Sequence, residues 1–527
     1  MSDDDFEGRA DIDEADWSPE AVEAVENQLV SIVRQLINSG ELQVLDDAES
    51  QPMPLPKITT RPDLNKLTNS AIYQNIKQAS GYGAGNGIPT KNFSLANMLA
   101  NRQSGIGSKG GAFVQSEKCK INNIFIPNRT STVINCCNSK VFCGRFSRNN
   151  SKFITVSQDG RIRVFDASNN RYPMIRQIEA KGVSWSILDI DFSPDDEYYV
   201  YSTWTDVLYF SRMENMDPDD IHCLHLEPND RKFGVFTVAF SNCSNQVMAG
   251  ANDGCIYSYD LIQDQRVLMV PVTKDRHDVN NVGFLDETSN IFFSGTDNGI
   301  IKIWDLRCLN EENAVPAGVF VGHYDGITYI DSRNDGRYIL SNSKDQSIKL
   351  WDLRVVSPPE ATINNRSYRY WDYRWDDIPN RFYNMTKSLQ GDTSVMTYRG
   401  HRVQKSLIRA KFSPAATTGQ RFIYTGCSTG RLVIYDTLTG QIVQAIESHR
   451  DIVRDASWHP HRPEILTSSW DYYVHLQSYK PVDTVGHYLI ASRIRLSDND
   501  ADSENEVQPL RRSRRIAERR LTQSRFN

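Results

Sequence analysis

The stretches Ile303-Trp304-Asp305-Leu306-Arg307 and Leu350-Trp351-Asp352-Leu353-Arg354 decide the fold of this chain. Each closes a short apolar run with Trp-Asp, each ends on an arginine, and the two stand 47 residues apart. Weaker copies of this ending recur at a period of about 46 residues through the middle of the sequence. These copies are Phe165-Asp166, Phe210-Ser211, Tyr259-Asp260, Tyr435-Asp436 and Leu476-Gln477. A repeat of this length indicates one structural unit that is used several times.

The repeats, from about residue 121 to 480, resemble the WD-repeat family, whose units are four-stranded propeller blades. Each unit contains alternating strands that are too short to bury their own faces, so neighbouring units must stack. Turns such as Asn252-Asp253-Gly254 suit tight hairpins because Gly and Asn accept positive φ. Seven units are present. We therefore predict an all-β, seven-bladed WD-repeat (WD40-type) β-propeller over 121–480, with one insertion at 358–396.

A fourth strand for the last unit must close the ring, because an open sheet leaves an unpaired edge. The last unit has three clear strands and ends at Val474-His475-Leu476. The upstream runs 121–126 and 132–136 and the downstream run 488–496 are the candidates for its partner. We favour the upstream segment, because it would tie the N-terminal strand to the last blade.

Residues 1–110 form an acidic, partly helical extension before the repeats. The apolar spacing predicts helices near 19–37 and 94–102. Between them, residues 41–91 are rich in Pro, Asn, Gly and Gln, which is typical of a linker. The second helix has its apolar residues on one side: Leu95, Met98 and Leu99.

The tail, residues 481–527, begins acidic and becomes basic. This order is typical of a disordered tail, and its basic part suits a nuclear localisation signal or a solvated end equally well. The whole chain has 527 residues and a formal net charge of −7, which argues against direct nucleic acid binding. It contains no apolar run close to the roughly 18 residues of a membrane span, so we expect a soluble intracellular protein with no membrane partner.

The sequence contains no motif for catalysis or metal binding. Its nine cysteines include no C-x-x-C pair, so neither a metal site nor a disulfide framework is expected. Nucleophile elbows, P-loops and His-Glu-x-x-His motifs are also missing. We therefore expect a protein that is not an enzyme, with no catalytic residues and no cofactor.

The WD-repeat resemblance implies a buried, hydrogen-bonded set of His, Ser, Asp and Trp in each complete unit. One unit of this chain matches it fully, with His323, Ser341, Asp345 and Trp351. Two further histidines, His401 and His449, stand at the matching position. In their units Thr429 replaces the turn aspartate and Gln477 replaces the tryptophan, so there the set decays.

The insertion, residues 358–396, is dense in aromatic residues and arginine. Its Trp371-Asp372-Tyr373-Arg374 imitates the repeat ending, but no alternating strand precedes it and it lies outside the repeat register. The aromatic side chains suit a cap on the propeller or a recognition surface, because Trp, Tyr and Arg dominate binding hot spots. Stacking against single-stranded nucleic acid is a third reading, weakened by the interleaved acidic residues.

The arginines Arg307 and Arg354 occupy the same offset in neighbouring units, directly after Asp305 and Asp352. Two planar, permanently charged groups one blade apart suit the docking of a partner's carboxylates and carbonyls. The alternative is an internal ion pair with the preceding aspartate or a nearby loop. Both interpretations stay open on composition alone.

Trp-Asp-x-Arg at the end of two consecutive repeats resembles the WD-repeat substrate receptors of cullin-4 ubiquitin ligases. Longer similarity lies in the run 316–354, in Trp371-Asp372-Tyr373-Arg374-Trp375 and in Ser457-Trp458-His459-Pro460. This resemblance implies that the arginines, with their aspartates, dock onto the ligase adaptor, the large subunit of the damage-specific DNA-binding protein. It also implies that an upstream helix inserts into the adaptor, with 94–102 the first candidate and 18–37 the second.

The resemblance further implies a non-catalytic specificity subunit that binds cullin-4 through the adaptor and presents a substrate protein for ubiquitination and proteasomal degradation. Substrates linked to this family include cap-n-collar bZIP transcription factors of the stress response, and a location in nucleus and cytoplasm is expected. Loops such as Trp204-Thr205-Asp206 and Ser428-Thr429-Gly430 would lie on the opposite, substrate-facing side. The alternative function is a general WD-repeat scaffold in a chromatin or RNA assembly.

Overall fold

The computed structural model describes most of the repeat region and part of the N-terminal extension. The described residues are 55–56, 62–82, 99–100, 103, 113–214, 220–229, 232–311, 314–361, 371–383, 385 and 387–481. The chain divides into two compact units, Met1–Tyr479 and Lys480–Asn527, and the fold below belongs to the first. The helix predicted near 19–37 and nearly all of the 481–527 tail lie outside the described residues.

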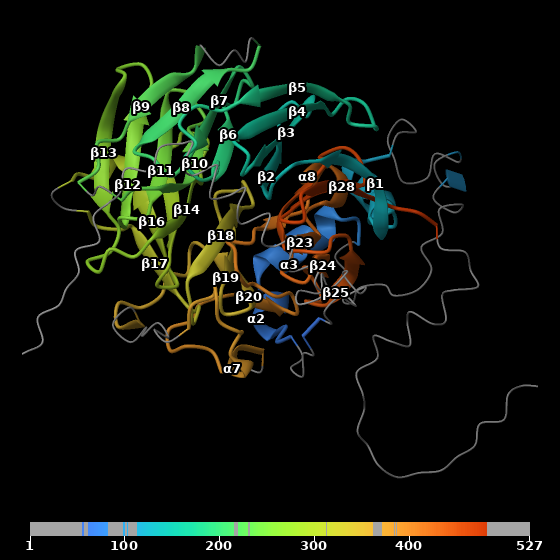
Figure 1. The fold of residues 1–527 in the computed structure, drawn as a ribbon. Coiled ribbons are helices and arrows are strands. Elements are labelled where there is room, and N and C mark those ends of the chain that lie inside the picture. The colour runs from blue at the N-terminus through green and yellow to red at the C-terminus, as the bar shows by residue number, and fades with distance from the viewer. Residues whose placement is uncertain are drawn as a thin grey trace, which may run out of the picture. The chain divides into compact units, whose positions relative to one another are not determined.

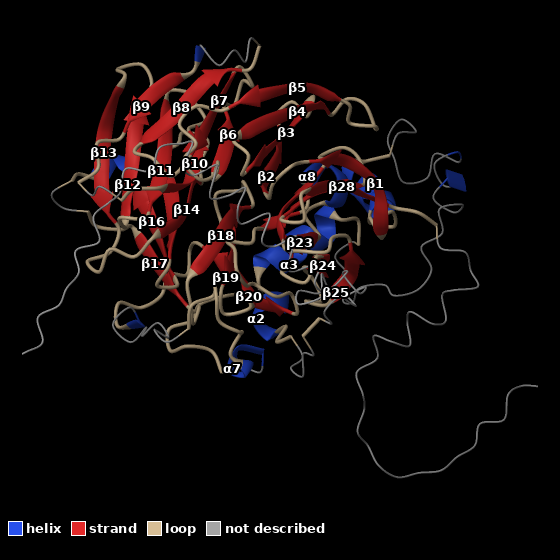
Figure 2. Ribbon diagram, in the orientation of Figure 1, coloured by secondary structure: helices blue, strands red, loops and turns tan. Residues whose placement is uncertain are grey.

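Seven four-stranded antiparallel sheets follow one another along the chain (Figures 1 and 2). Blade 1 consists of β2 (Val141–Phe146), β3 (Lys152–Ser157), β4 (Arg161–Asp166) and β5 (Met174–Glu179). Blade 2 consists of β6 (Asp189–Phe192), β7 (Tyr198–Ser202), β8 (Val207–Arg212) and β9 (His222–His225). Blade 3 consists of β10 (Val235–Phe240), β11 (Gln246–Ala251), β12 (Cys255–Asp260) and β13 (Gln265–Pro271). Blades 4 and 5 consist of β14 (Val279–Phe284), β15 (Ile291–Thr296), β16 (Ile300–Asp305) and β17 (Gly318–Val321); and β18 (Ile327–Ser332), β19 (Tyr338–Ser343), β20 (Ser347–Asp352) and β21 (Met396–Arg399). Blades 6 and 7 consist of β22 (Ala410–Phe412), β23 (Phe422–Gly426), β24 (Arg431–Asp436) and β25 (Ile442–Glu447); and β26 (Val453–Trp458), β27 (Glu464–Ser469), β28 (Tyr473–Ser478) and β1 (Arg129–Cys136). The predicted seven-bladed WD-repeat propeller is confirmed.

The ring closes through a strand from upstream of the repeats. β1 pairs antiparallel with β28, with Val133 opposite His475, and so completes blade 7. The first strands of successive blades contact one another from β2 through β6, β10, β14 and β18 to β22, and β26 contacts β2 again. The expectation of upstream closure is confirmed, although residues 121–126 lie in and after helix α5 rather than in a strand.

The antiparallel order of the strands gives the propeller two faces. The Trp-Asp face contains the turns between first and second strands and the residues that follow each third strand, including Arg307 and Arg354. The opposite face contains the loops that lead into each first strand and the hairpins between second and third strands, including Trp204 and Trp470. Because all blades share the same strand order, Arg307 and Arg354 end on the same face.

The inner three strands of each blade are buried, and the outermost is more exposed. All residues of β19 and β20 are buried, whereas five of the six residues of β5 are exposed. Trp304 and Trp351 have no exposed surface and pack between blades. Blade-to-blade burial on this scale supplies the partner that each short sheet lacks alone.

Residues 65–79 differ from the predicted linker. Two helices form there, α2 (Asn65–Thr68) and α3 (Ala71–Ala79). Leu67, Ile72 and Ile76 have no exposed surface and join the hydrophobic core between blades 5 and 6. The Asn- and Gln-rich composition concealed these helices, whose few apolar residues all turn to one side.

The other helices are short and partly outside the described residues. α5 (Gln115–Asn122) packs against α8 (Ala415–Thr418), and α7 (Asn380–Tyr383) lies in the insertion. Of the helix predicted at 94–102, the structure describes Leu99 and Ala100, both helical and exposed, whereas Leu95 and Met98 lie outside the described residues. No helix in the described ranges is long and apolar enough to cross a membrane.

Residues 371–383 of the insertion form a strap that reaches the opposite face. Lys344 lies over the Tyr373 ring at 3.8 Å from its centroid, and Lys405 N–H donates to the Tyr373 carbonyl at 2.7 Å. Trp371-Asp372-Tyr373-Arg374 adopts a turn, in which Arg374 N–H donates to Asp372 Oδ1 at 2.9 Å. This part of the insertion is therefore an ordered cap, and its Arg374 lies on the face opposite Arg307 and Arg354.

Candidate functional site

Arg307 is held by the aspartate that precedes it. Asp305 caps a 3-10 turn at Leu306–Cys308 by accepting the Arg307 main-chain N–H at 3.0 Å. The same carboxylate accepts Arg307 Nε at 2.9 Å and Nη2 at 2.6 Å, and these hydrogen bonds lower the pKa of Asp305 to about 2. The Arg307 side chain is still 64% exposed. Arg307 therefore forms an ion pair within the chain and is still accessible at the surface.

Arg354 has a different environment at the same offset. Its main-chain N–H donates to Asp352 Oδ1 at 3.1 Å, but the Asp352 carboxylate is occupied by Arg337, whose Nη2 lies 2.7 Å away. The Arg354 side chain is exposed and forms no ion pair with any residue the structure describes. It is available to an external acceptor.

The difference between the two arginines comes from the residue before each second strand. Arg337 precedes β19, and its carbonyl accepts the Leu353 N–H; Asn290 precedes β15, and its carbonyl accepts the Leu306 N–H. A neutral Asn290 leaves Asp305 free to pair with Arg307, whereas Arg337 takes Asp352 away from Arg354. Sequence reasoning missed Arg337, because its partner is set by the adjacent turn and not by the Trp-Asp motif.

The chain after Arg354 joins the two motifs into one surface. Ser357 N–H donates to Val319 in β17 at 2.9 Å, and Ser357 Oγ accepts Val321 N–H at 3.0 Å. Between Arg354 and Ser357 lie Val355 and Val356, whose side chains are 51% and 48% exposed. We call Arg307, Arg354, Val355 and Val356 the docking patch; it combines two cationic groups with exposed apolar surface.

The helices α2 and α3 lie on the same face as the docking patch. Lys66 Nζ donates to the Asp392 carbonyl at 3.3 Å, and a Cβ on Gly419, in the turn after β22, would lie 2.7 Å from Ala79. A Cβ on Gly440, in the turn after β24, would lie 2.9 Å from Pro62. An N-terminal helical segment therefore covers the Trp-Asp face of blades 5 and 6, the face on which Arg354 also lies.

The His–Ser–Asp–Trp residues of blade 5 form one buried hydrogen-bonded chain. His323 lies 3.0 Å from Asp345 and 2.6 Å from Ser341, and Trp351 Nε1 donates to Ser341 Oγ at 2.8 Å. His323, Ser341 and Asp345 have no exposed surface, and pairing with the histidine lowers the pKa of Asp345 despite burial. The arrangement links β19, β20 and the turn between them to the loop before β18.

Blade 7 builds the same chain with substitutes. His449 lies 3.0 Å from Asp471 and 2.8 Å from Thr467, and Gln477 Nε2 donates to Thr467 Oγ1 at 3.2 Å. Gln477 thus takes the role of the tryptophan. In blade 4, Trp304 Nε1 still donates to Ser294 at 2.9 Å.

The third histidine, His401, forms different contacts. Thr429, in the turn where the aspartate would stand, bonds Cys427 instead, and His401 lies 3.0 Å from Tyr435 Oη and 2.9 Å from Asn342 Oδ1. Burial lowers the pKa of His401 to about 3. It is a neutral structural residue at physiological pH.

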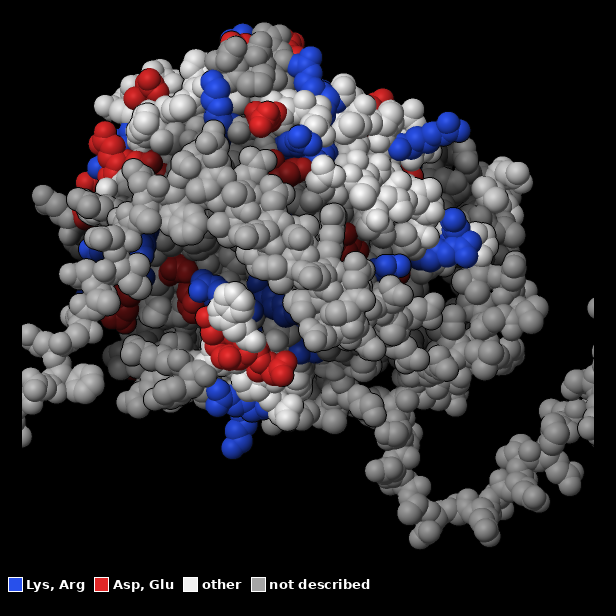
Figure 3. Space-filling model, in the orientation of Figure 1, with Lys and Arg blue, Asp and Glu red and all other residues white. Residues whose placement is uncertain are grey.

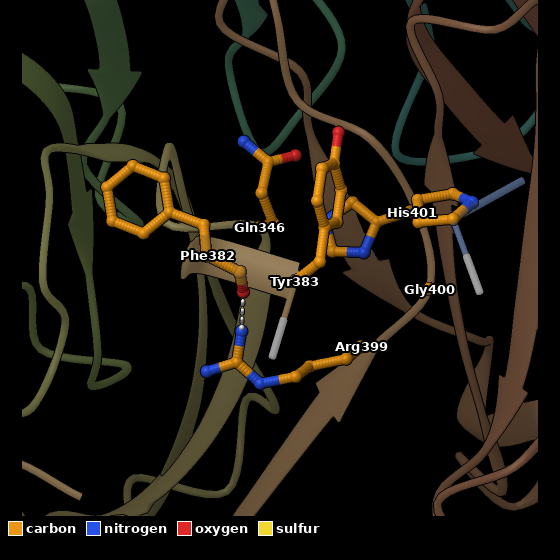
Figure 4. A pocket seen from close by; sticks show the side chains of 7 residues that line it. Gln346, Phe382, Tyr383, Arg399, Gly400 and His401 are labelled. Carbon is orange, nitrogen blue, oxygen red and sulfur yellow. Dashed lines mark hydrogen bonds between the residues drawn. The ribbon is translucent and has the colours of Figure 1, made fainter. Parts of the chain in front are cut away.

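A small cavity lies beside His401, under the strap (Figure 4). Gln346, Phe382, Tyr383 and Gly400 help line it, and Arg399 donates to the Phe382 carbonyl at 3.0 Å. No cluster of metal-binding side chains occurs in the described part of the chain. These groups hold the strap in place and form no catalytic constellation.

We expect His401 to make the stability of this fold pH-dependent. Because its folded pKa lies below its ordinary value, the unfolded chain binds the extra proton first, so stability is lost as pH falls below 6.5. The loss is about 1.4 kcal/mol at pH 5.5. Denaturant unfolding at pH 7.5 and 5.5 should show this loss in the natural chain relative to His401→Gln; equal pH slopes would contradict it. The comparison is needed because Asp325 and Asp331, whose pKa values burial raises to about 7 and about 6, act in the opposite direction.

Basic and acidic side chains are interspersed on the face shown in Figure 3.

The closed ring of four-stranded blades, with Trp-Asp endings and two complete polar chains, defines a WD-repeat β-propeller. The family model "WD domain, G-beta repeat" matches residues 128–166, 271–305, 314–352 and 440–476.

Several relatives extend the match beyond the repeats. The chain is 37% identical to the DDB1- and CUL4-associated factor 11 homolog of Caenorhabditis elegans, over 67% of this chain and 63% of the relative. It is 38% identical to the homolog of Caenorhabditis briggsae, over 69% and 67%, and 37% identical to the LEC14B protein of Lithospermum erythrorhizon, over 72% and 80%. The chain belongs to this family of DDB1- and CUL4-associated factor 11 and LEC14B proteins. Its match spans just under two thirds of the first of these relatives.

Proposed function

We propose that this chain is a substrate-recognition subunit of a cullin-4 ubiquitin ligase and binds the adaptor DDB1 through the Trp-Asp face. The docking patch carries this proposal. Arg354 is an exposed guanidinium without an ion-pair partner among the described residues, and the exposed Val355 and Val356 follow it toward β17 of blade 4. Arginine beside apolar surface is a frequent hot-spot composition.

The position of the N-terminal helices supports the same face. α2 and α3 pack on blades 5 and 6, on the same face as the patch, and present exposed polar residues there. We propose that these helices, rather than residues 94–102 alone, frame the adaptor contact. The contributions of Leu95, Met98 and Leu99 to that contact stay a prediction.

The family names support the partner. The relatives are called DDB1- and CUL4-associated, and we infer the same association for this chain. In this role the chain presents a substrate and carries out no chemistry itself. A cap-n-collar bZIP transcription factor as substrate, degradation by the proteasome, and a nuclear and cytoplasmic location stay predictions.

Affinity capture of the full chain from cells, scored for DDB1 and cullin-4, tests this function. The natural chain should retain both proteins, and Arg354→Glu should lose both while keeping its melting temperature. Arg374→Glu is the matched control, because Arg374 ends a similar Trp-Asp-x-Arg sequence on the opposite face. Failure of the natural chain to retain DDB1, with chromatin or RNA-binding proteins captured instead, would replace the proposal with the scaffold function.

A further inference from the structure

Arg454 is a buried cation that forms no ion pair with any residue the structure describes. It lies at the start of β26, on the opposite face, and is 4% exposed. Its guanidinium donates to the carbonyl oxygens of Phe142 and, at 3.4 Å, of Leu188. Burial and the nearby Arg409 lower the pKa of Arg454 to about 10, and the carboxylates of Asp189 and Asp455 offset only part of this effect. A buried guanidinium without an ion-pair partner is costly, so this site favours an added carboxylate.

A row of aromatic side chains on the same face meets Arg454 at Phe142. Phe142 lies under the Arg454 guanidinium, 5.1 Å from it, and contacts Trp470 of blade 7 and Trp185 on its two sides, with ring centroids 5.8 and 5.5 Å apart. Trp185 contacts Trp204, which contacts Phe236 of blade 3, at 6.1 and 5.4 Å. We call these five residues the aromatic row.

Part of the aromatic row is exposed to solvent. Trp185 is 48% exposed, and Trp204 and Phe236 are partly exposed. Lys140 Nζ lies 4.3 Å from the Trp470 ring centroid and adds a second cation at one end. The row therefore combines apolar surface with positive charge, a composition that is complementary to an acidic and apolar ligand.

The centre of the ring below Arg454 is already filled. Arg409 pairs with Asp189 at 2.7 Å, and Lys411 pairs with Asp455 at 2.7 Å. These pairs are buried and satisfied, so they offer no further site for a charged ligand. A ligand would meet Arg454 from the surface.

The geometry points to the aromatic row and Arg454 as the docking site for an internal, extended segment of the substrate protein that carries one acidic side chain between apolar residues. This inference rests on the proposed function, because it names the substrate class of that receptor. The row continues on both sides of Phe142, toward blade 7 and toward blade 3. An internal segment can use both directions, whereas a chain end that gave its terminal carboxylate to Arg454 could use only one.

A peptide array probed with the full-length chain tests this inference without the adaptor. The array carries nine-residue peptides with a central Glu flanked by every pair of apolar residues. Beside each peptide are a copy with Gln in place of Glu and a copy that ends at the Glu with a free C-terminus. We expect binding to the internal-Glu peptides, at least tenfold weaker binding to the Gln copies, and no preference for the free C-terminus.

Three variants locate the binding. Arg454→Gln should lose the preference for Glu over Gln, and Trp185→Ala should weaken all binding about tenfold. Trp375→Ala is the control, because Trp375 is 83% exposed on the strap and outside the row. Since Trp185 is half exposed, its variant keeps the test decisive even if Arg454→Gln does not fold.

No bound peptide, equal binding of Glu and Gln copies, preference for the free C-terminus, or an effect of Trp375 rather than Trp185 would each overturn the inference. Loss of DDB1 capture with intact peptide binding would instead contradict only the proposed function.

Discussion

Arg409→Ala is expected to destabilise the propeller by about 3–5 kcal/mol. The guanidinium joins blade 6 to blade 2 through Asp189 at 2.7 Å and to blade 7 through Asp455 at 3.5 Å, and it also contacts Cys143 of blade 1 at 3.1 Å. Its removal leaves the buried carboxylate of Asp189 without its ion-pair partner and leaves Asp455 with Lys411 alone, which costs more than the pair itself contributes. Denaturant unfolding at pH 7.5 measures the loss.

The loss of stability caused by Arg409→Ala should become smaller at acidic pH. In the natural chain Arg409 helps hold the pKa of Asp189 and Asp455 below the ordinary value, so their stability contribution is present above about pH 4 and is lost as pH falls through the folded pKa. Without Arg409 these carboxyl groups take up a proton more readily, which removes the unpaired charge. A loss below about 1 kcal/mol at pH 7.5, or one that grows on acidification, would contradict this account. Arg307→Ala is the control, because its exposed ion pair should leave the melting temperature unchanged.

The fold could be predicted because its repeats carry residues with strong local requirements. Trp351, His323 and Asp345 each need a specific buried partner, and their spacing gives the blade. Gln477 could not be predicted as a tryptophan substitute, since only its distance to Thr467 shows that the hydrogen bond survives the change of residue. The helices at 65–79 were missed because three buried apolar residues among polar ones give little periodic signal.

For the candidate site, the sequence predicted the position of the two arginines but not their surroundings. Arg307 and Arg354 are equivalent in sequence, and both could be placed on one face from the strand order. Their different environments depend on Arg337 and Asn290, each of which lies 15 residues before the aspartate of its motif and meets the motif only through antiparallel pairing. Arg454 could not be recognised as a candidate site from the sequence, because its lack of an ion-pair partner among the described residues is a property of tertiary packing.

Arg354→Ala is expected to weaken binding to purified DDB1 by about 3 kcal/mol, on the order of a hundredfold, with an unchanged melting temperature. Arg307→Ala should cost less than Arg354→Ala, because Arg307 must first give up or share the Asp305 carboxylate that holds its Nε and Nη2. Titration calorimetry or biolayer interferometry with the single variants and the double variant measures both effects.

A further variant separates docking from the ion pair. Arg337→Ala frees the Asp352 carboxylate, which lies within reach of the Arg354 main chain, and should let Arg354 fold back onto it as Arg307 does onto Asp305. Binding to DDB1 should then weaken although both motif arginines are still present. If Arg337→Ala leaves the affinity unchanged while Arg354→Ala abolishes binding, the availability of Arg354 is not what the adaptor recognises. If both leave it unchanged, Arg354 does not contribute to docking, and only an effect of Arg307→Ala would keep the Trp-Asp face as the docking face.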